Sequence, residues 1–152
     1  MNILVTYATN SGSTYLVAKY ISEKLQEHTH QVTLLNIMDA NPEDLLKYDL
    51  VFLGSNSWDF EHKEGQPHHA FMQFLDGIKD VQLSDHKYVL FGCGDKSYQY
   101  FCGALTVIEE FVKAHAGQVI AEPLKINQYF FNDTDKIHSQ IDSWLSEVEQ
   151  KF

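Results

Sequence analysis

Short runs of apolar residues alternate along this chain with longer segments whose apolar residues recur every three or four positions. The runs at 51–53 and 89–91 are entirely apolar, which is typical of strands buried on both faces. Leu16, Val17, Ile21 and Leu25 instead fall on one face of a helix. The pattern predicts strands at 2–7, 31–37, 50–54, 88–92 and 118–126 (interrupted by Pro123), helices at 13–26, 68–78, 103–115 and 134–149, and a helical turn at 42–47.

Regular alternation of strands and helices indicates an α/β fold. We expect one domain over residues 1–152, built on a doubly wound sheet of five parallel strands with helices on both faces. Ligands of such sheets bind beyond the carboxyl ends of the strands. Three loops are expected there, at 9–14, 55–65 and 92–102.

The first loop, Thr9-Asn10-Ser11-Gly12-Ser13-Thr14, combines four hydroxyls, one amide and one glycine ahead of a predicted helix. Backbone N–H groups at a helix N-terminus lack intrahelical partners and favour an anion such as phosphate. The nearest lysine is Lys19, inside the helix, so the loop lacks the cation of a nucleotide triphosphatase. This favours a phosphate that is held rather than transferred. The simpler alternative is a Ser/Thr-rich helix cap.

The other two loops supply aromatic side chains. Trp58 follows the third predicted strand, and Tyr98 and Tyr100 follow the fourth. Gly92 and Gly94 permit close approach of the backbone to a ligand. Aromatic side chains on both sides of a phosphate loop predict a planar ring stacked between them. The alternative is that these aromatic residues are part of the core or of a partner interface.

Composition narrows the classes of partner. The net charge of −10 disfavours nucleic acid and anionic membranes and favours basic protein partners. No apolar run approaches the length of a membrane span, and no signal peptide is expected. Two cysteines, Cys93 and Cys102, match no zinc pattern and suggest reduced thiols in the cytoplasm. We expect a cytoplasmic monomer without a metal site.

Taken together, these motifs resemble the flavodoxin family. Residues 9–14 match its phosphate motif T/S-x-T-G-x-T, with Ser11 and Ser13 in place of the usual Thr and Asn. Trp58 matches the aromatic residue after the third strand, and the segment G-C-G-D-x-S-Y-x-Y-F-C-G occupies 92–103. The resemblance covers the whole chain and lacks the insertion of long-chain members. It implies a short-chain, flavodoxin-like sheet of strand order 2-1-3-4-5.

The resemblance also implies a low-potential electron carrier that holds flavin mononucleotide (FMN) non-covalently, with no substrate of its own, and exchanges electrons with basic redox proteins. The FMN phosphate is then bound by Thr9, Asn10, Ser11, Gly12, Ser13 and Thr14. The phosphate and ribityl chain lie near Ser55, Asn56 and Ser57. Trp58 covers the inner face of the isoalloxazine and Tyr98 the outer face. The pyrimidine edge meets backbone groups of Gly94, Asp95 and Cys102, and the site is lined further by Cys93, Tyr100 and the neighbouring Gly92.

Asp59 departs from the family pattern. Many short-chain members have glycine there, where a peptide flips to hydrogen-bond the flavin N5–H after one-electron reduction. Since Asp tolerates the required positive φ less well, we expect the one-electron-reduced flavin to be less stabilised. Carboxylates at 59, 61, 64 and 95 disfavour an anionic reduced flavin, which predicts a low potential. The histidines at 62, 68 and 69 are expected to be solvated rather than metal ligands.

Other functions are compatible with parts of this pattern. A flavin enzyme such as a quinone reductase needs an added substrate pocket or oligomer-forming insertion, for which 152 residues leave little room. A signalling receiver domain needs acidic residues after the first strand and an Asp after the third, which residues 7–9 and 54–56 do not supply. A flavin-binding maturation partner of another enzyme stays open.

Overall fold

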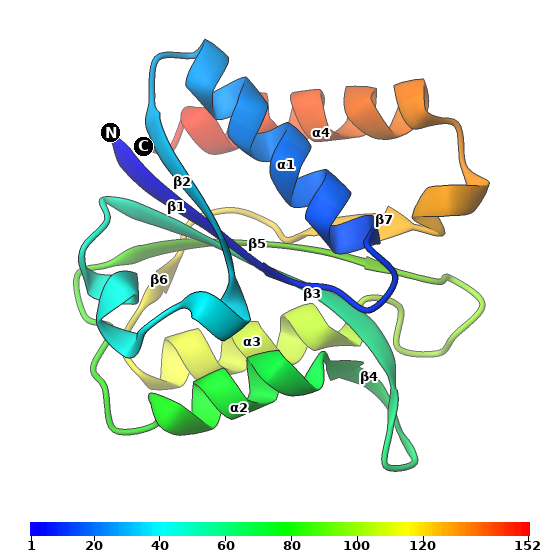
Figure 1. The fold of residues 1–152 in the computed structure, drawn as a ribbon, viewed down its shortest axis with the longest axis horizontal. Coiled ribbons are helices and arrows are strands. Elements are labelled where there is room, and N and C mark those ends of the chain that lie inside the picture. Colours follow the sequence, from blue (N-terminus) through cyan, green and yellow to red (C-terminus); the bar gives the residue numbers. More distant parts are fainter.

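The computed structural model describes residues 1–152 and has a central sheet between two helical layers (Figure 1). The strands lie in the order β2-β1-β3-β5-β6, so the predicted 2-1-3-4-5 order is confirmed. All neighbours in this order are parallel. The strands are β1 (Asn2–Ala8), β2 (Gln31–Asn36), β3 (Leu50–Phe60), β4 (Lys63–Pro67), β5 (Lys87–Gly94), β6 (Gln118–Val119) and β7 (Leu124–Asn127).

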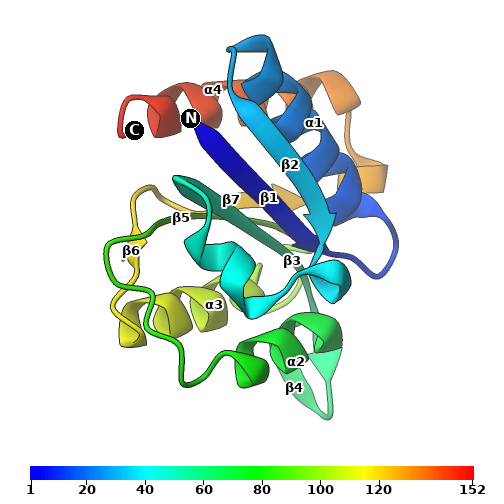
Figure 2. The same ribbon diagram turned by 60° about the vertical axis from the view of Figure 1, so that its left-hand side comes forward.

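Two apolar clusters hold the helices onto opposite faces of the sheet (Figure 2). Helices α1 (Ser13–Glu27) and α4 (Thr134–Glu149) cover one face, and α2 (His69–Gly77) and α3 (Gly103–Ala114) cover the other. Alternate residues of β1 serve the two clusters, Ile3 in the first and Leu4 in the second. This is the continuous apolar strand pattern expected of a sheet buried on both sides. Short 3₁₀ helices lie at η1 (Ile37–Asp39), η2 (Pro42–Leu46) and η3 (Tyr129–Phe131).

The third strand is longer than predicted. The sequence indicates a strand ending at Gly54 and a loop to Gly65, but β3 continues to Phe60 and pairs antiparallel with β4. Glu61 and His62 form the two-residue turn, with φ of 50° and 63°. Positive φ at both positions is the type I′ hairpin geometry, normally made by Asn-Gly. The hairpin was missed because this pair carries no turn signal.

The fifth predicted strand is also corrected. It is divided into β6 and β7, which both pair with β5. Pro123 lies in the gap and has no backbone N–H to donate to a neighbouring strand. The remaining element boundaries agree with the predictions within one or two residues.

The two chain ends lie close together at the end of the sheet where the parallel strands begin, opposite the loops described below (Figure 2). The Met1 amino group lies 3.5 Å from His30 Nδ1, and the Phe152 ring packs edge-on against the His30 ring at 5.4 Å. The edge formed by the carboxyl ends of the strands is therefore free of both termini.

Candidate cofactor site

The loop at 9–14 joins β1 to α1 in a fixed conformation. Gly12 has φ 96°, the left-handed region that favours glycine, at the residue that caps α1. Its N–H donates to Thr9 Oγ1 at 2.9 Å, which closes the loop on itself. The hydroxyl of Thr9 is therefore used to shape the loop.

The rest of this loop leaves hydrogen-bonding groups without protein partners. No protein group accepts from the N–H groups of Ser13 and Thr14. Thr14 Oγ1 and Asn56 Oδ1 are buried and have no hydrogen-bond partner. An unpaired buried polar atom costs about 1–3 kcal/mol unless a ligand satisfies it. The donors and the helix dipole here suit an anion, and Asn56 suits a hydroxyl donor.

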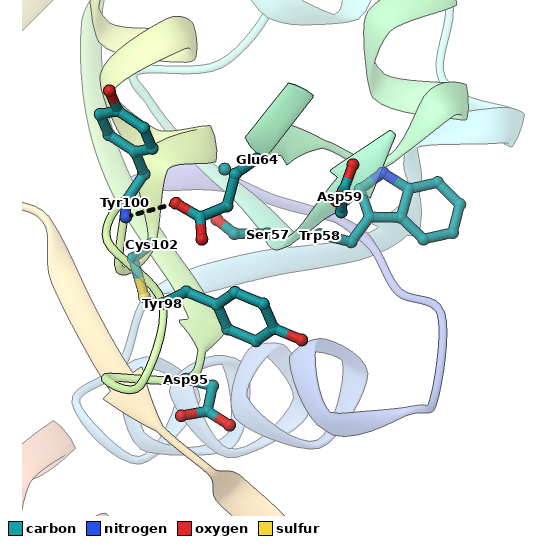
Figure 3. A pocket seen from close by; sticks show the side chains of 9 residues that line it. Ser57, Trp58, Asp59, Glu64, Asp95, Tyr98, Tyr100 and Cys102 are labelled. Atoms are coloured by element: carbon teal, nitrogen blue, oxygen red, sulfur yellow. Dashed lines mark hydrogen bonds between the residues drawn. The ribbon is translucent and has the colours of Figure 1, made fainter. Parts of the chain in front are cut away.

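Two adjoining cavities open beside this loop. One, of about 250 Å³, is bordered by Ser11, Ser13 and Asn56 and reaches Cys93 and Gly94. The other, of about 140 Å³, lies between Trp58 and Tyr98 and is shown in Figure 3. Both are lined by Ser57, Trp58 and Asp95, so the two cavities adjoin. No Lys or Arg lines either cavity. The structure thus brings together the three loops that the sequence predicts at this edge.

A carboxylate ties the β3–β4 hairpin to the loop at 95–102. Glu64 Oε2 accepts from Tyr100 N at 2.9 Å (Figure 3). Glu64 Oε1 accepts from Gln99 N at 3.3 Å. Ser57 Oγ accepts from Ala104 N at 2.9 Å, at the start of α3. The sequence predicts Glu64 as part of an acidic rim and Ser57 as a cofactor contact. In the structure both groups also fix the shape of the cavity.

Two glycines permit this close docking. A Cβ at Gly65 would lie 2.7 Å from Tyr100 Cβ, and one at Gly103 would lie 2.8 Å from the Gly65 carbonyl oxygen. Gly65 also has φ 74°. The hairpin can therefore reach the start of α3 only with glycine at both positions.

The two predicted stacking rings lie in different surroundings. Trp58 Nε1 donates to the Pro67 carbonyl at 3.1 Å, and its indole stacks on the His68 ring at 5.3 Å and 8°. In Figure 3 the indole points away from Tyr98. Tyr98 is 55% exposed. Both rings border one cavity without touching each other. Their stacking on a flavin stays a prediction.

Ser55 and His68 connect the end of β3 to the start of α2. Ser55 is fully buried, donates to the Asn56 carbonyl at 2.9 Å and accepts from His68 N at 3.0 Å. His68 Nδ1 accepts from Ala70 N at 3.1 Å and caps α2. Burial, and to a smaller extent His69, lower the pKa of His68 below its usual value. His68 is therefore neutral at pH 7 and has a structural role that the sequence analysis missed.

The two thiols are buried and are not joined in a disulfide. Burial raises the pKa of Cys93 to about 11 and that of Cys102 to about 12. Both stay protonated at neutral pH. No group of three or more His, Cys, Asp or Glu side chains is arranged to hold a metal ion, and no helix is long and apolar enough to cross a membrane.

Asp59 lies exposed at a bulge between Trp58 and Phe60. Its φ is not positive, and the left-handed residues of this segment are those of the turn, Glu61 and His62. Asp95 accepts from Ser97 N at 2.8 Å, and hydrogen bonds from Gln128 and Ser97 lower the pKa of its carboxyl. Asp95 is thus charged at neutral pH, and Asp59 and Asp95 both border the smaller cavity.

The larger cavity is also lined by four residues that the sequence analysis did not predict: Gln128, Tyr129, Phe130 and Phe131. They follow β7, whose carboxyl end lies at the same edge as those of β1, β3 and β5. An aromatic run directly after the last predicted strand was the available signal.

Comparison with known proteins identifies the group to which this architecture belongs. Residues 5–137 match the family model described as flavodoxin. The chain belongs to the flavodoxin family. Flavodoxin from Maridesulfovibrio salexigens is 34% identical over 150 residues, which cover 98% of this chain and 97% of that protein. The resemblance drawn from the motifs is therefore confirmed.

Solved flavodoxin structures have the same fold. Oxidised flavodoxin 2 from Bacillus cereus has a TM-score of 0.88 and 30% identity, with each chain covered completely. A flavodoxin from Fusobacterium nucleatum bound to FMN has a TM-score of 0.81 and 18% identity, covering 99% of this chain and 98% of that one. Flavodoxins are FMN-binding electron carriers that transfer electrons to redox partners.

Proposed function

We propose that FMN binds across the two cavities with its phosphate at residues 9–14 and its ring beside Trp58 and Tyr98. The observation that carries this assignment is the pair of buried, unpartnered atoms Thr14 Oγ1 and Asn56 Oδ1 beside the free N–H groups of the loop. These groups match a phosphate and a ribityl hydroxyl in chemistry. Since no cation lines the cavities, the phosphate is held by hydroxyls and the helix dipole.

The remaining contacts are those that the family resemblance implies, and the residues lining the two cavities support them. Trp58 covers the inner face of the ring and Tyr98 the outer face. The pyrimidine edge lies at the backbone of Gly94, Asp95 and Cys102. When bound, FMN supplies the redox chemistry, and the protein holds the ring, limits its contact with water and presents one edge to a partner.

The chain is further proposed to work as a low-potential carrier between protein partners, without a substrate of its own. Asp59, Glu64 and Asp95 line the ring-side cavity and Glu61 lies on the turn of the adjoining hairpin, and these carboxylates oppose the gain of further negative charge on reduction. The same carboxylates and the net charge of −10 favour partners with a basic face.

The test is the visible spectrum of the purified protein, followed by anaerobic stepwise reduction. Flavin bands near ~375 and ~450 nm, with FMN released on denaturation, are expected for a bound flavin. A colourless protein that also fails to bind added FMN would contradict the proposal. Exchange of electrons with a basic redox protein, weakened by salt, tests the partner assignment.

A further inference from the structure

The 3₁₀ helix η3 carries three aromatic residues to the mouth of the larger cavity. Tyr129 is partly buried and packs against the core cluster under α1 and α4. The Phe130 ring lies edge-on to Tyr129 at 5.3 Å, and it is 55% exposed. Phe131 is 87% exposed. All three border the cavity that Ser11 and Ser13 also border. Two exposed phenyl rings thus share a cavity with the polar loop.

The segment that presents these rings is held firmly. Gln128 N donates to the Gly94 carbonyl at 2.8 Å, and Gln128 Nε2 donates to Asp95 Oδ2 at 3.0 Å. Lys96 N donates to Asn127 Oδ1 at 2.9 Å. Gln128 has φ 44°, a left-handed conformation that is costly for a residue with a side chain. Such a conformation persists only where its surroundings fix it, so the placement of the phenyl rings is determined by these bonds.

The loop at 9–14, which lines the same cavity, is the reason that an apolar wall would matter there. The loop at 9–14 holds its anion with hydroxyls and N–H dipoles and without a cation. Dipolar attraction to a phosphate is weak in water and stronger where water is excluded. A loop without lysine or arginine therefore depends more on exclusion of water than one with a cation.

We propose that Phe130 and Phe131 form a third aromatic wall of the cofactor site, which covers the ribityl–phosphate half of FMN and excludes water from the phosphate loop. This inference rests on the proposed function. It assigns to these two residues a part of the site separate from the ring contacts of Trp58 and Tyr98.

The test compares FMN with riboflavin, which lacks the phosphate, on the apoprotein. The double variant Phe130→Ala/Phe131→Ala is expected to raise the Kd for FMN about tenfold and to speed FMN dissociation. The Kd for riboflavin is expected to change by less than about threefold. Flavin fluorescence quenching measures both. Phe130→Leu/Phe131→Leu keeps an apolar wall and is expected to restore most of the FMN affinity.

Controls separate the wall from other effects. Met38→Ala truncates another exposed apolar side chain, 72% exposed and outside both cavities, and should leave both affinities unchanged. Urea midpoints of the apoprotein check that each variant folds. An unchanged FMN affinity in the double alanine variant, or an equal loss of affinity for FMN and riboflavin, would contradict the proposed role of Phe130 and Phe131. A wild-type protein that binds neither flavin would instead overturn the proposed function.

Discussion

The loop at 9–14, proposed to hold the phosphate, and the loops around Trp58 and Tyr98, proposed to hold the ring, lie at one end of the sheet but are built in opposite ways. The loop at 9–14 makes one internal hydrogen bond, from Gly12 to Thr9, and leaves Thr14 Oγ1 and nearby N–H groups unpartnered. The hairpin instead satisfies the loop at 95–102 through Glu64 and the start of α3 through Ser57. One half of the site offers unpaired groups, and the other offers a fixed shape.

This contrast implies different responses to mutation. Groups kept unpaired cost stability in the free protein and gain their partners on binding. Groups that are already paired stabilise the free protein and act on the ligand only through position. Variants of the phosphate loop should therefore change cofactor affinity, whereas variants of the ring side should first change stability.

The largest expected effect is on the ring side, at Gly65. Gly65→Ala adds a Cβ 2.7 Å from Tyr100 Cβ at a positive φ, so we expect a loss of about 2–4 kcal/mol in the free energy of unfolding. Urea denaturation of the apoprotein measures this loss. Gly77→Ala is the matched control, because a Cβ there meets nothing within 4 Å. Equal stability of the two variants would show that the hairpin does not depend on this contact.

The next effect is on the phosphate loop. Thr14→Val removes a buried hydroxyl that has no protein partner, so the apoprotein should keep its stability or gain about 1–3 kcal/mol. The Kd for FMN should rise by about 10- to 150-fold, because a hydrogen bond to a charged group contributes about 1.5–3 kcal/mol. Flavin fluorescence titration measures the affinity, and urea denaturation the stability.

A second threonine provides the opposite case. Thr6 is also fully buried, but its hydroxyl donates to the Phe52 carbonyl at 3.2 Å. Thr6→Val should cost about 1 kcal/mol of stability and leave FMN affinity unchanged. If Thr14→Val lost stability without losing affinity, the hydroxyl would be structural and the distinction between the two halves of the site would fail.

A smaller effect is expected at Glu64, whose carboxylate accepts from the backbone N–H groups of Gln99 and Tyr100. Glu64→Ala should lower stability by about 1 kcal/mol and speed hydrogen exchange at the amides of Gln99 and Tyr100. Glu64→Gln keeps an acceptor and should do less. Glu61→Gln removes the same charge from the exposed turn and should leave the exchange rates unchanged. Faster exchange in the Glu61 variant would show that the loss of negative charge, and not the loss of the hydrogen bonds to Glu64, speeds exchange.

The smallest effect concerns pH. Since burial lowers the pKa of His68, the unfolded chain takes up a proton before the folded protein does as the pH falls. The stability from neutral His68 is complete above pH ~6.5 and is lost below it. His68→Asn keeps a helix-capping acceptor and should flatten this dependence, whereas His62→Asn, on the exposed turn, should not. Urea midpoints between pH 7.5 and 5.5 measure both; an unchanged slope in His68→Asn would exclude His68 as the cause.

The sequence was sufficient for the sheet and for the strand–loop–helix junction at 9–14, because both depend on local patterns. Strands buried on both faces must be apolar throughout, and a phosphate loop needs hydroxyls and glycine next to a helix start. Neither requirement depends on distant residues. The meeting of the three loops followed from the parallel alternation of strands and helices, whereas the strand order came from the resemblance to the flavodoxin family.

The ring side could not be predicted to the same depth. The turn at Glu61 and His62 adopts positive φ without glycine or asparagine, so no turn signal marks the hairpin. The pairing of Glu64 with Tyr100 and of Ser57 with Ala104 depends on how two distant segments dock. A carboxylate that binds backbone N–H groups cannot be told from a solvated one in the sequence alone.

Because Met1 and Phe152 both contact His30, the order of the helices and strands along the chain could be changed. A short linker between these ends would close the chain, which could then be opened between α2 and β5. Both the junction and the new ends would lie at the edge opposite the cofactor cavities. Such a circular permutant should fold and bind FMN, because the site requires the strands to lie side by side and not to be synthesised in one particular order.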